Sequence, residues 1–301
     1  MLTSANLVGI MPAIPTLVSD DDRVDAAAVR THFDWLLGQG IDGVLPLGGT
    51  GEYGALSRTE RNRMAALSVE AMKGHGPVIA GVLETGFHDA LQSTREFADQ
   101  GVDAVLVVTP YYTNPTQAGI RDYYLRLADA SPLPVLVYEI PYRTRISVAP
   151  TVIHELSRHE RMIGMKACNT DMYHFLQIMA GIGPDFSVMS GEDILFPLHV
   201  AAGAKGGIIV TANLLPRAWR SIFDAASSGD TQTALAIHRR LIPIMNMAFA
   251  ETNPGPMKAV MDLVGVRAPK PLAPLVSPNP ELVANLRAEL SKQLDISERG
   301  S

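Results

Sequence analysis

The run Met162-Ile163-Gly164-Met165-Lys166 ends a short apolar segment with an amine. A short apolar segment without polar alternation is typical of a strand that is buried on both faces. A lysine on an exposed surface needs no special explanation. A lysine at the end of a buried strand is costly unless its charge is paired or its amine is used as a nucleophile. Lys166 is therefore a candidate to attack a carbonyl carbon and form a Schiff base.

Similar apolar runs lie elsewhere in the first 210 residues of the chain. They are residues 8–10, 43–46, 78–81, 104–108, 135–138, 186–189 and 207–210. Amphipathic stretches with helical spacing separate most of these runs, most clearly at residues 26–37 and 59–72. Eight buried strands, most of them followed by a helix, predict an α/β fold of the (β/α)8 type, which is a TIM barrel.

An open, doubly wound sheet is the main alternative fold. Such a sheet usually carries a Gly-x-Gly-x-x-Gly turn after its first strand. Here the first predicted strand leads into Met11-Pro12-Ala13-Ile14-Pro15 instead. The sequence therefore favours the barrel.

The chain after about Leu214 has no further strand-like runs. Residues 241–250, 256–264 and 281–294 have helical patterns, and a proline-rich link lies at residues 268–280. We therefore expect two parts, a catalytic barrel over residues 1–225 and a C-terminal helical extension over residues 226–301 that packs on the barrel.

The composition excludes several classes of protein. The chain has 301 residues, of which 47% are hydrophobic and 19% charged, as in a globular protein. The net charge of −6 and the lack of a dense basic cluster argue against a nucleic-acid partner. The N-terminal residues do not resemble a signal peptide, and no apolar stretch is long enough to span a membrane. We therefore expect a cytoplasmic protein with neither a nucleic-acid nor a membrane partner.

The cysteine and histidine content argues against a metal centre. The single cysteine, Cys168, excludes an internal disulfide and a cysteine-cluster metal site, and we interpret it as an inert buried thiol. The spacing of His154, His159 and His174 relative to acidic residues is not that of metal ligands. We therefore expect no metal and no other cofactor, which disfavours a metal-dependent aldolase.

The residues that follow each predicted strand are the candidates for the site, because the strand ends on one face build the active site of a TIM barrel. Tyr138 and Lys166 end neighbouring parallel strands, whose axes lie about 5 Å apart. A phenol next to an amine suits imine chemistry, since the hydroxyl can transfer protons to and from the substrate. Arg143, on the same rim, can hold a carboxylate through two hydrogen bonds, although its position alone fits a solvated surface arginine equally well.

A glycine-rich loop, Gly48-Gly49-Thr50-Gly51-Glu52, follows the second predicted strand. Its N–H groups are little covered by side chains and can form a nest for a carboxylate or a phosphate. A tight turn that merely requires positive φ is the alternative interpretation, and it is the simpler one for this loop taken alone. We interpret Glu52, at the end of the loop, as a structural hydrogen-bond acceptor rather than a general base.

Several motifs in a fixed order carry a resemblance to a known family. They are Gly48-Gly49-Thr50-Gly51-Glu52, Tyr111-Tyr112, Tyr138 followed by Ile140-Pro141-x-Arg143-Thr144, Gly164-Met165-Lys166, Ser190-Gly191-Glu192-Asp193, Gly203-x-x-Gly206-Gly207-Ile208-x-Val210-x-Ala212-Asn213 and Asn253-Pro254-x-Pro256-x-Lys258. The ordered set covers nearly the full chain. It resembles the dihydrodipicolinate synthase/N-acetylneuraminate lyase family of class I, Schiff-base aldolases.

The resemblance implies a role for each matching residue. Lys166 would form the imine with pyruvate or another 2-oxo acid, and Tyr138 would be the proton shuttle. The backbone N–H groups of Gly49 and Thr50 would bind the carboxylate of the 2-oxo acid. Ile208 would contribute a backbone carbonyl next to the imine.

The resemblance also implies a second substrate and an assembly. Arg143 matches the arginine that holds the carboxylate of the aldehyde substrate in the synthase branch. Tyr112 matches the tyrosine that one subunit lends to the proton relay of its neighbour. Members of the family are typically homotetramers built as dimers of dimers.

The chain departs from the synthase pattern at several positions. The synthase branch has a hydroxyl residue where this chain has Gly49, so a path of hydrogen bonds from Tyr138 to Tyr112 would need a water molecule. It also usually has Asn in place of Glu139. Tyr53 and Thr85 replace small polar and Asn side chains of the lysine-feedback site, so we do not expect inhibition by lysine.

The resemblance therefore implies an enzyme, a carbon–carbon or carbon–oxygen lyase acting through a lysine Schiff base. Aldol condensation of the 4-hydroxy-tetrahydrodipicolinate synthase type is the first hypothesis, on account of Ile140-Pro141-x-Arg143-Thr144. The Gly-Gly-Thr-Gly-Glu loop instead resembles enzymes that cleave or dehydrate 2-keto-3-deoxy sugar acids. A barrel that binds a 2-oxo acid as a sensor, without catalysis, is a third hypothesis, suggested by Gly49.

Overall fold

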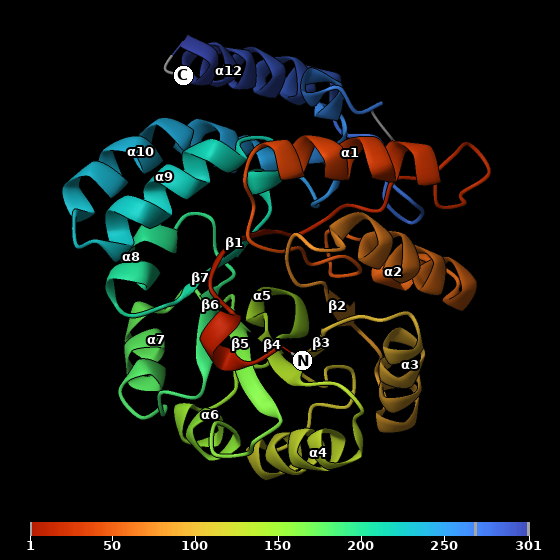
Figure 1. Cartoon of the computed structure of the whole chain (residues 1–301), viewed down its shortest axis with the longest axis vertical. Coiled ribbons are helices and arrows are strands. Elements are labelled where there is room, and N and C mark those ends of the chain that lie inside the picture. Colours follow the sequence, from red (N-terminus) through yellow and green to blue (C-terminus); the bar gives the residue numbers. More distant parts are fainter. Residues whose placement is uncertain (1, 268–269, 300–301) are drawn as a thin grey trace.

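The computed structural model of the chain describes residues 2–267 and 270–299. Its parallel strands form one sheet in the order β1-β7-β6-β5-β4-β3-β2, and helices surround the sheet (Figure 1). The strands are β1 (Gly9–Pro12), β2 (Ile79–Val82), β3 (Ala104–Val108), β4 (Val135–Glu139), β5 (Met162–Ala167), β6 (Ser187–Ser190) and β7 (Gly206–Ile209). Every residue of these strands is buried, and this is why their sequences are apolar runs without polar alternation.

The second predicted strand closes the barrel between β1 and β2, although it is too short to form a regular ladder. Isolated parallel bridges join Leu45 to Ala13 on one side and Val44 to Val78 on the other. Leu47, two residues after Leu45, has a φ of 64°, so the chain leaves the extended conformation at Leu47. The predicted (β/α)8 barrel is therefore confirmed, with one strand reduced to bridges.

Most helices of the barrel lie on the outside of the sheet, whereas the short helix α5 (Pro141–Thr144) lies inside the ring of helices (Figure 1). The helices of the barrel are α1 (Ala26–Gly38), α2 (Arg58–Met72), α3 (Phe87–Asp99), α4 (Gln117–Ala130), α5 (Pro141–Thr144), α6 (Pro150–Leu156), α7 (Met172–Met179), α8 (Phe196–Ala201) and α9 (Pro216–Ser227). Short 3-10 helices lie at η1 (Ser4–Asn6), η2 (Tyr53–Ala55) and η3 (Thr211–Asn213). The two helices that the sequence predicts most clearly are confirmed as α1 and α2, and the side chains of Asp25 and Ser57 cap them.

The chain continues after α9 as α10 (Thr231–Ala248), α11 (Gly255–Lys258), the 3-10 helix η4 (Met261–Val264) and α12 (Pro280–Arg299). Helix α10 packs against α9, and α12 packs against α10 (Figure 1). The predicted helix over residues 241–250 is the second half of α10. The first half was not predicted, and it begins where the side chain of Asp230 accepts a hydrogen bond from the Thr233 N–H at 3.0 Å.

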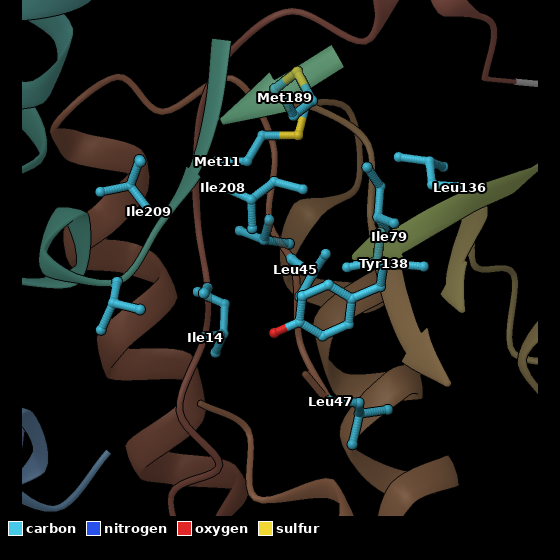
Figure 2. Packing of buried hydrophobic residues seen from close by; sticks show 14 of the residues in the cluster. Met11, Ile14, Leu45, Leu47, Ile79, Leu136, Tyr138, Met189, Ile208 and Ile209 are labelled. Atoms are coloured by element: carbon cyan, nitrogen blue, oxygen red, sulfur yellow. The ribbon is translucent and has the colours of Figure 1, made fainter. Parts of the chain in front are cut away.

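Buried apolar side chains fill the inside of the barrel and the layer between strands and helices. Figure 2 shows Met11, Leu45 and Ile79 in this cluster, with the ring of Tyr138 among them. Part of the Tyr138 side chain thus packs against apolar side chains of the core. In the described part of the chain, no helix has the length and apolar character needed to cross a membrane.

Candidate active site

A cavity of about 460 Å³ opens where the predicted strand ends meet. The residues that line it come from the loops after the strands and from the C-terminal helices: Gly49, Thr50, Tyr138, Tyr142, Arg143, Lys166, Gly191, Glu192, Asp193, Ile194, Val210, Met245, Asn246, Phe249 and Asn253. Lys166, Tyr138, Gly49, Thr50 and Arg143, which the sequence predicts as site residues, all line this cavity.

Lys166 and Tyr138 lie side by side at the end of two neighbouring strands. They are directly paired in the parallel register of β4 and β5, and the Lys166 Nζ lies 5.0 Å from the centroid of the Tyr138 ring. Only 4% of Lys166 and 3% of Tyr138 is exposed. Burial raises the pKa of the Tyr138 phenol well above its ordinary value, so the hydroxyl keeps its proton at neutral pH and can donate it.

The loop formed by residues 48–52 lies against this pair. A Cβ atom added at Gly49 would be 3.8 Å from the Tyr138 hydroxyl and 3.7 Å from the Nε of Arg143. The turn is closed by a hydrogen bond from the Glu52 N–H to the Gly49 carbonyl at 3.2 Å. In the described part of the chain, the N–H groups of Gly49 and Thr50 have no acceptor. They are free to bind an anion.

The segment between α10 and α11 contacts both the loop of residues 48–52 and the side chain of Arg143. Asn253 donates from Nδ2 to the Thr50 hydroxyl at 2.9 Å, and its carbonyl accepts from Nη2 of Arg143 at 3.2 Å. The sequence indicates Asn253 only as the first residue of the Asn253-Pro254-x-Pro256-x-Lys258 motif. The contact could not be foreseen, because 203 positions separate Asn253 from Thr50.

Glu52 has the structural role that its sequence position suggested. Its Oε1 accepts from the Leu272 N–H at 2.6 Å, and its Oε2 lies 2.6 Å from the Nζ of Lys258. Glu52 and Lys258 are both buried, so their charges neutralise each other away from water. The sequence indicates Lys258 only as a member of the Asn253-Pro254-x-Pro256-x-Lys258 motif.

The loop after β6 brings two acidic residues to the cavity. Asp193 is buried and accepts hydrogen bonds from the Val210 N–H and from the N–H and hydroxyl of Thr211, at 3.1, 2.9 and 2.7 Å. The Glu192 carboxyl forms no hydrogen bond or ion pair with any other described residue. Burial, reinforced by the nearby charge of Asp193, raises the pKa of Glu192 to about 7, and the charge of Lys166 opposes that rise.

Two of the predicted site residues do not line the cavity. Tyr112, in the loop between β3 and α4, is 86% exposed. Ile208 is fully buried in β7, where it pairs with Met11 of β1. Val210, two residues after Ile208, is the residue of this segment that lines the cavity.

Glu139 points away from the cavity although it follows Tyr138 directly. Successive side chains of a strand point to opposite faces, so Glu139 faces the surrounding helices. Its Oε1 accepts from the Val148 N–H at 3.0 Å and lies 3.1 Å from the Nε2 of His174. This departure from the synthase pattern therefore does not touch the cavity.

The remaining candidate side chains have structural surroundings. Cys168 is buried, its Sγ donates to the Gly191 carbonyl at 3.4 Å, and burial raises the pKa of its thiol far above the ordinary value. Such a thiol is a poor nucleophile. Across residues 2–267 and 270–299, no group of histidine, cysteine and acidic side chains is arranged to hold a metal ion.

The geometry agrees with a comparison of the whole chain with known proteins. The family model described as "Dihydrodipicolinate synthetase family" matches residues 6–293. A 4-hydroxy-tetrahydrodipicolinate synthase from Acidiphilium cryptum is 36% identical over 270 residues, which are 89% of this chain and 92% of that protein. A protein of the same name from Methanosarcina barkeri is 37% identical over 281 residues, which are 92% of this chain and 96% of that protein.

Solved structures resemble the fold over almost the same length. The crystal structure of dihydrodipicolinate synthase from Aquifex aeolicus has a TM-score of 0.91 at 31% identity and covers 95% of this chain and 98% of that one. The corresponding structure from Thermotoga maritima has a TM-score of 0.91 at 29% identity, with coverages of 95% and 98%. The similarity therefore includes the barrel, the rim loops and the C-terminal helices.

Proposed function

Because the chain belongs to the dihydrodipicolinate synthetase family, we propose that it is a Schiff-base lyase with 4-hydroxy-tetrahydrodipicolinate synthase activity. Its substrates would be pyruvate, or a related 2-oxo acid, and an aldehyde such as aspartate semialdehyde. No cofactor takes part in the proposed reaction. The observation that carries the proposal is the amine of Lys166 next to the phenol of Tyr138 at the end of paired strands.

The proposed reaction begins with attack of the Lys166 Nζ on C2 of the 2-oxo acid. Tyr138 donates its proton to the hydroxyl of the carbinolamine, which leaves as water, and an imine forms. The Tyr138 oxygen then accepts a proton from C3, and the resulting enamine attacks the carbonyl carbon of the aldehyde, whose oxygen takes up the proton from Tyr138. Attack on the new imine carbon by water or by an amine of the bound product then releases the Lys166 amine. The raised pKa of Tyr138 supports this assignment, because its phenolate is a strong enough base to take the proton back.

Two groups on the same rim can bind the carboxylates of the substrates. The free N–H groups of Gly49 and Thr50 suit the carboxylate of the 2-oxo acid. The backbone carbonyl of Ile208 has a different role in the proposal, since it would lie next to the imine. The guanidinium of Arg143, held at one nitrogen by the Asn253 carbonyl, suits the carboxylate of the aldehyde.

The proposal includes the assembly and location of the protein. The exposed ring of Tyr112 is available to complete the proton relay of a second copy, within a homotetramer built as a dimer of dimers. At Gly49 that relay would pass through a water molecule. We place the enzyme in the cytoplasm, with a catalytic barrel at residues 1–225 and a helical extension at residues 226–301.

The alternative activity, cleavage or dehydration of 2-keto-3-deoxy sugar acids, has one observation in its favour. Gly49 brings no hydroxyl to the space between Tyr138 and Arg143, and this space is available to a hydroxyl of the substrate itself.

Borohydride reduction in the presence of pyruvate tests the Schiff base. Peptide mass spectrometry of the reduced protein should find the pyruvate-derived adduct on Lys166. Lys166→Ala should remain unlabelled, whereas Lys205→Ala, which changes a lysine outside the cavity, should label like the parent protein. Equal labelling of Lys166→Ala and the parent would refute the assignment.

A substrate panel separates the candidate activities. Consumption of pyruvate with aspartate semialdehyde would support the synthase, and release of pyruvate from 2-oxo-3-deoxy acids would support the alternative. A 2-oxo-acid sensor would form the adduct without turning over any member of the panel.

A further inference from the structure

Arg143 lies in a turn that leaves the end of β4 and returns to it. The turn starts after Glu139, the last residue of β4, and includes the short helix α5, which lies inside the ring of helices (Figure 1). Only four residues of the turn are helical, and Arg143 itself is exposed. A short, irregular segment has many accessible conformations unless contacts hold its ends. The direction of the Arg143 side chain therefore depends on how this turn is closed.

The side chain of Glu139 closes the turn, which we define as residues 140–148. Its Oε1 accepts a hydrogen bond from the Val148 N–H at 3.0 Å, and the side chain is fully buried. Gln117 of α4 also holds the returning segment, through the Ser147 carbonyl at 2.9 Å and the Ala149 N–H at 2.7 Å, but Gln117 is exposed. Water can replace the bonds of an exposed amide, whereas a buried donor that loses its acceptor stays unpaired. The bond from Val148 to Glu139 is therefore the stronger closure.

Residues that follow β5 hold the Glu139 carboxylate in place. Nε2 of His174 lies 3.1 Å from Oε1, and Nδ2 of Asn169 lies 3.5 Å from the same oxygen and donates to the Ser147 hydroxyl at 3.3 Å. In the described part of the chain, the buried Oε2 has no hydrogen-bond partner. A buried carboxylate with one unpaired oxygen is costly for folding, so its presence at this turn points to a role in the site.

The tip of the Arg143 side chain is held from another direction. Its Nη2 donates to the Asn253 carbonyl at 3.2 Å. A guanidinium binds a carboxylate through two parallel hydrogen bonds only when its plane is correctly oriented. That orientation requires both the contact at the tip and a fixed backbone at residue 143, and Glu139 supplies the second condition.

We propose that Glu139 is a positioning residue for Arg143: it closes the turn of residues 140–148 and so orients the guanidinium toward the carboxylate of the second substrate. Glu139 touches no substrate, because its side chain points to Val148 and His174 and away from the cavity. This inference rests on the proposed lyase function. It adds a residue outside the cavity that determines how tightly the aldehyde binds.

Kinetics of Glu139→Ala test the proposal. KM for aspartate semialdehyde should rise by about 3- to 10-fold, because a mobile guanidinium must be ordered when the aldehyde binds. KM for pyruvate should stay within about twofold of the parent value, since Lys166 and Thr50 lie outside the turn. Glu139→Gln, which keeps an acceptor of the same length for the Val148 N–H, should restore most of the affinity for the aldehyde.

Glu60→Ala is the matched control for a general loss of stability. Glu60 is also a buried carboxylate that accepts a backbone N–H, that of Val24 at 2.6 Å, and it does not line the cavity. Urea unfolding should show that Glu60→Ala and Glu139→Ala are both destabilised, whereas only Glu139→Ala should change KM for the aldehyde. In a chain that already carries Arg143→Ala, Glu139→Ala should cause no further rise in this KM, because the side chain that it positions is absent.

Hydrogen exchange tests the closure of the turn without any substrate. Peptides that cover residues 140–148 should exchange faster in Glu139→Ala than in the parent protein, and Glu60→Ala should leave their exchange unchanged. Glu139→Asp, whose side chain is shorter by one methylene, gives the same comparisons if Glu139→Ala does not fold.

Four results would overturn the proposal. They are a parent-like KM for aspartate semialdehyde in Glu139→Ala, an equal rise for both substrates, a full further rise in the Arg143→Ala chain, or unchanged exchange of residues 140–148. If the parent protein forms the borohydride-reduced adduct and consumes aspartate semialdehyde while any of these results is found, only the role of Glu139 fails. If the parent protein itself forms no adduct at Lys166, or does not consume aspartate semialdehyde, the synthase proposal fails and the role of Glu139 fails with it.

Discussion

Lys258 and Glu52 form a buried ion pair between residues that are 206 positions apart, with 2.6 Å between Nζ and Oε2. The same ammonium donates to the Thr16 carbonyl at 2.9 Å. Glu52 ends the loop that carries Gly49 and Thr50, so the pair joins the C-terminal helices to the loop proposed to bind the carboxylate of the 2-oxo acid. The C-terminal helices thus help to hold the loop of residues 48–52 in place beside the cavity.

Lys258→Met should destabilise the protein by about 3–5 kcal/mol, because it leaves the charge of Glu52 buried without its partner. The free energy of unfolding, measured with urea, checks this value. Arg30→Gln is the control: it removes the exposed pair with Glu70 and should cost less than about 1 kcal/mol. A double variant, Lys258→Met with Glu52→Gln, should recover part of the loss. A single-variant effect no larger than that of the control would contradict a structural role for the pair.

Tyr138→Phe should lower kcat by about 10²- to 10⁴-fold, because it removes the proton donor and leaves the ring in place. The Tyr138 hydroxyl forms no hydrogen bond with another described residue, so the free energy of unfolding should change by less than about 1 kcal/mol. Steady-state kinetics and urea unfolding measure the two effects. Tyr173→Phe, at an exposed position on α7, should change neither. If Tyr138→Phe kept more than half of the parent kcat, Tyr138 would not be the proton shuttle.

Gly49→Thr should fold normally and raise the synthase kcat several-fold. A Cβ at this position meets Tyr138 and Arg143 at ordinary contact distances of 3.8 and 3.7 Å, and the added hydroxyl can replace the water in the relay. Gly49→Val has the same shape without the hydroxyl and is the matched control. An equal gain in both variants, or none in Gly49→Thr, would show that the missing hydroxyl does not limit the rate.

Gly191→Ala should have the opposite effect on the site. A Cβ there would lie 2.8 Å from the Cε of Lys166 and would also collide with the Sγ of Cys168. We expect a loss of about 1–3 kcal/mol in the free energy of unfolding and slower Schiff-base formation, because the lysine must move. Gly54→Ala, where a Cβ meets nothing within 4 Å, is the control for both measurements. Labelling of Gly191→Ala at the parent rate would mean that the lysine has room to adjust.

The central part of the site could be predicted because it depends on local pattern and barrel geometry. Buried runs identify the strands, and the register of neighbouring parallel strands brings Tyr138 next to Lys166. The orientation of Glu139 also follows from strand alternation, although the resemblance indicates only that this residue departs from the synthase pattern. In the structure it faces Val148 and His174.

The rest of the site depends on contacts between distant segments. Asn253 meets Thr50, and Lys258 meets Glu52, across more than 200 positions, and no periodicity or spacing predicts such pairs. The raised pKa of Glu192 depends on its burial next to Asp193, which is known only after folding. The first half of α10 was missed because a single capping side chain, Asp230, decides where the helix begins.

His174→Gln should show a pH-dependent effect on stability. The hydrogen bond to Glu139 raises the pKa of His174 above its ordinary value of 6.5 in the folded protein. A raised folded-state pKa means that the stabilisation is fully present below about pH 6.5 and is lost as the pH rises through the folded value. Urea unfolding should therefore give a difference between parent and variant of about 1–2 kcal/mol at pH 5.5 and a smaller one at pH 8.5. His88→Gln, at an exposed position, should give no such trend. A difference that grew with pH would show that the neutral imidazole, and not the imidazolium, is the form that Glu139 stabilises.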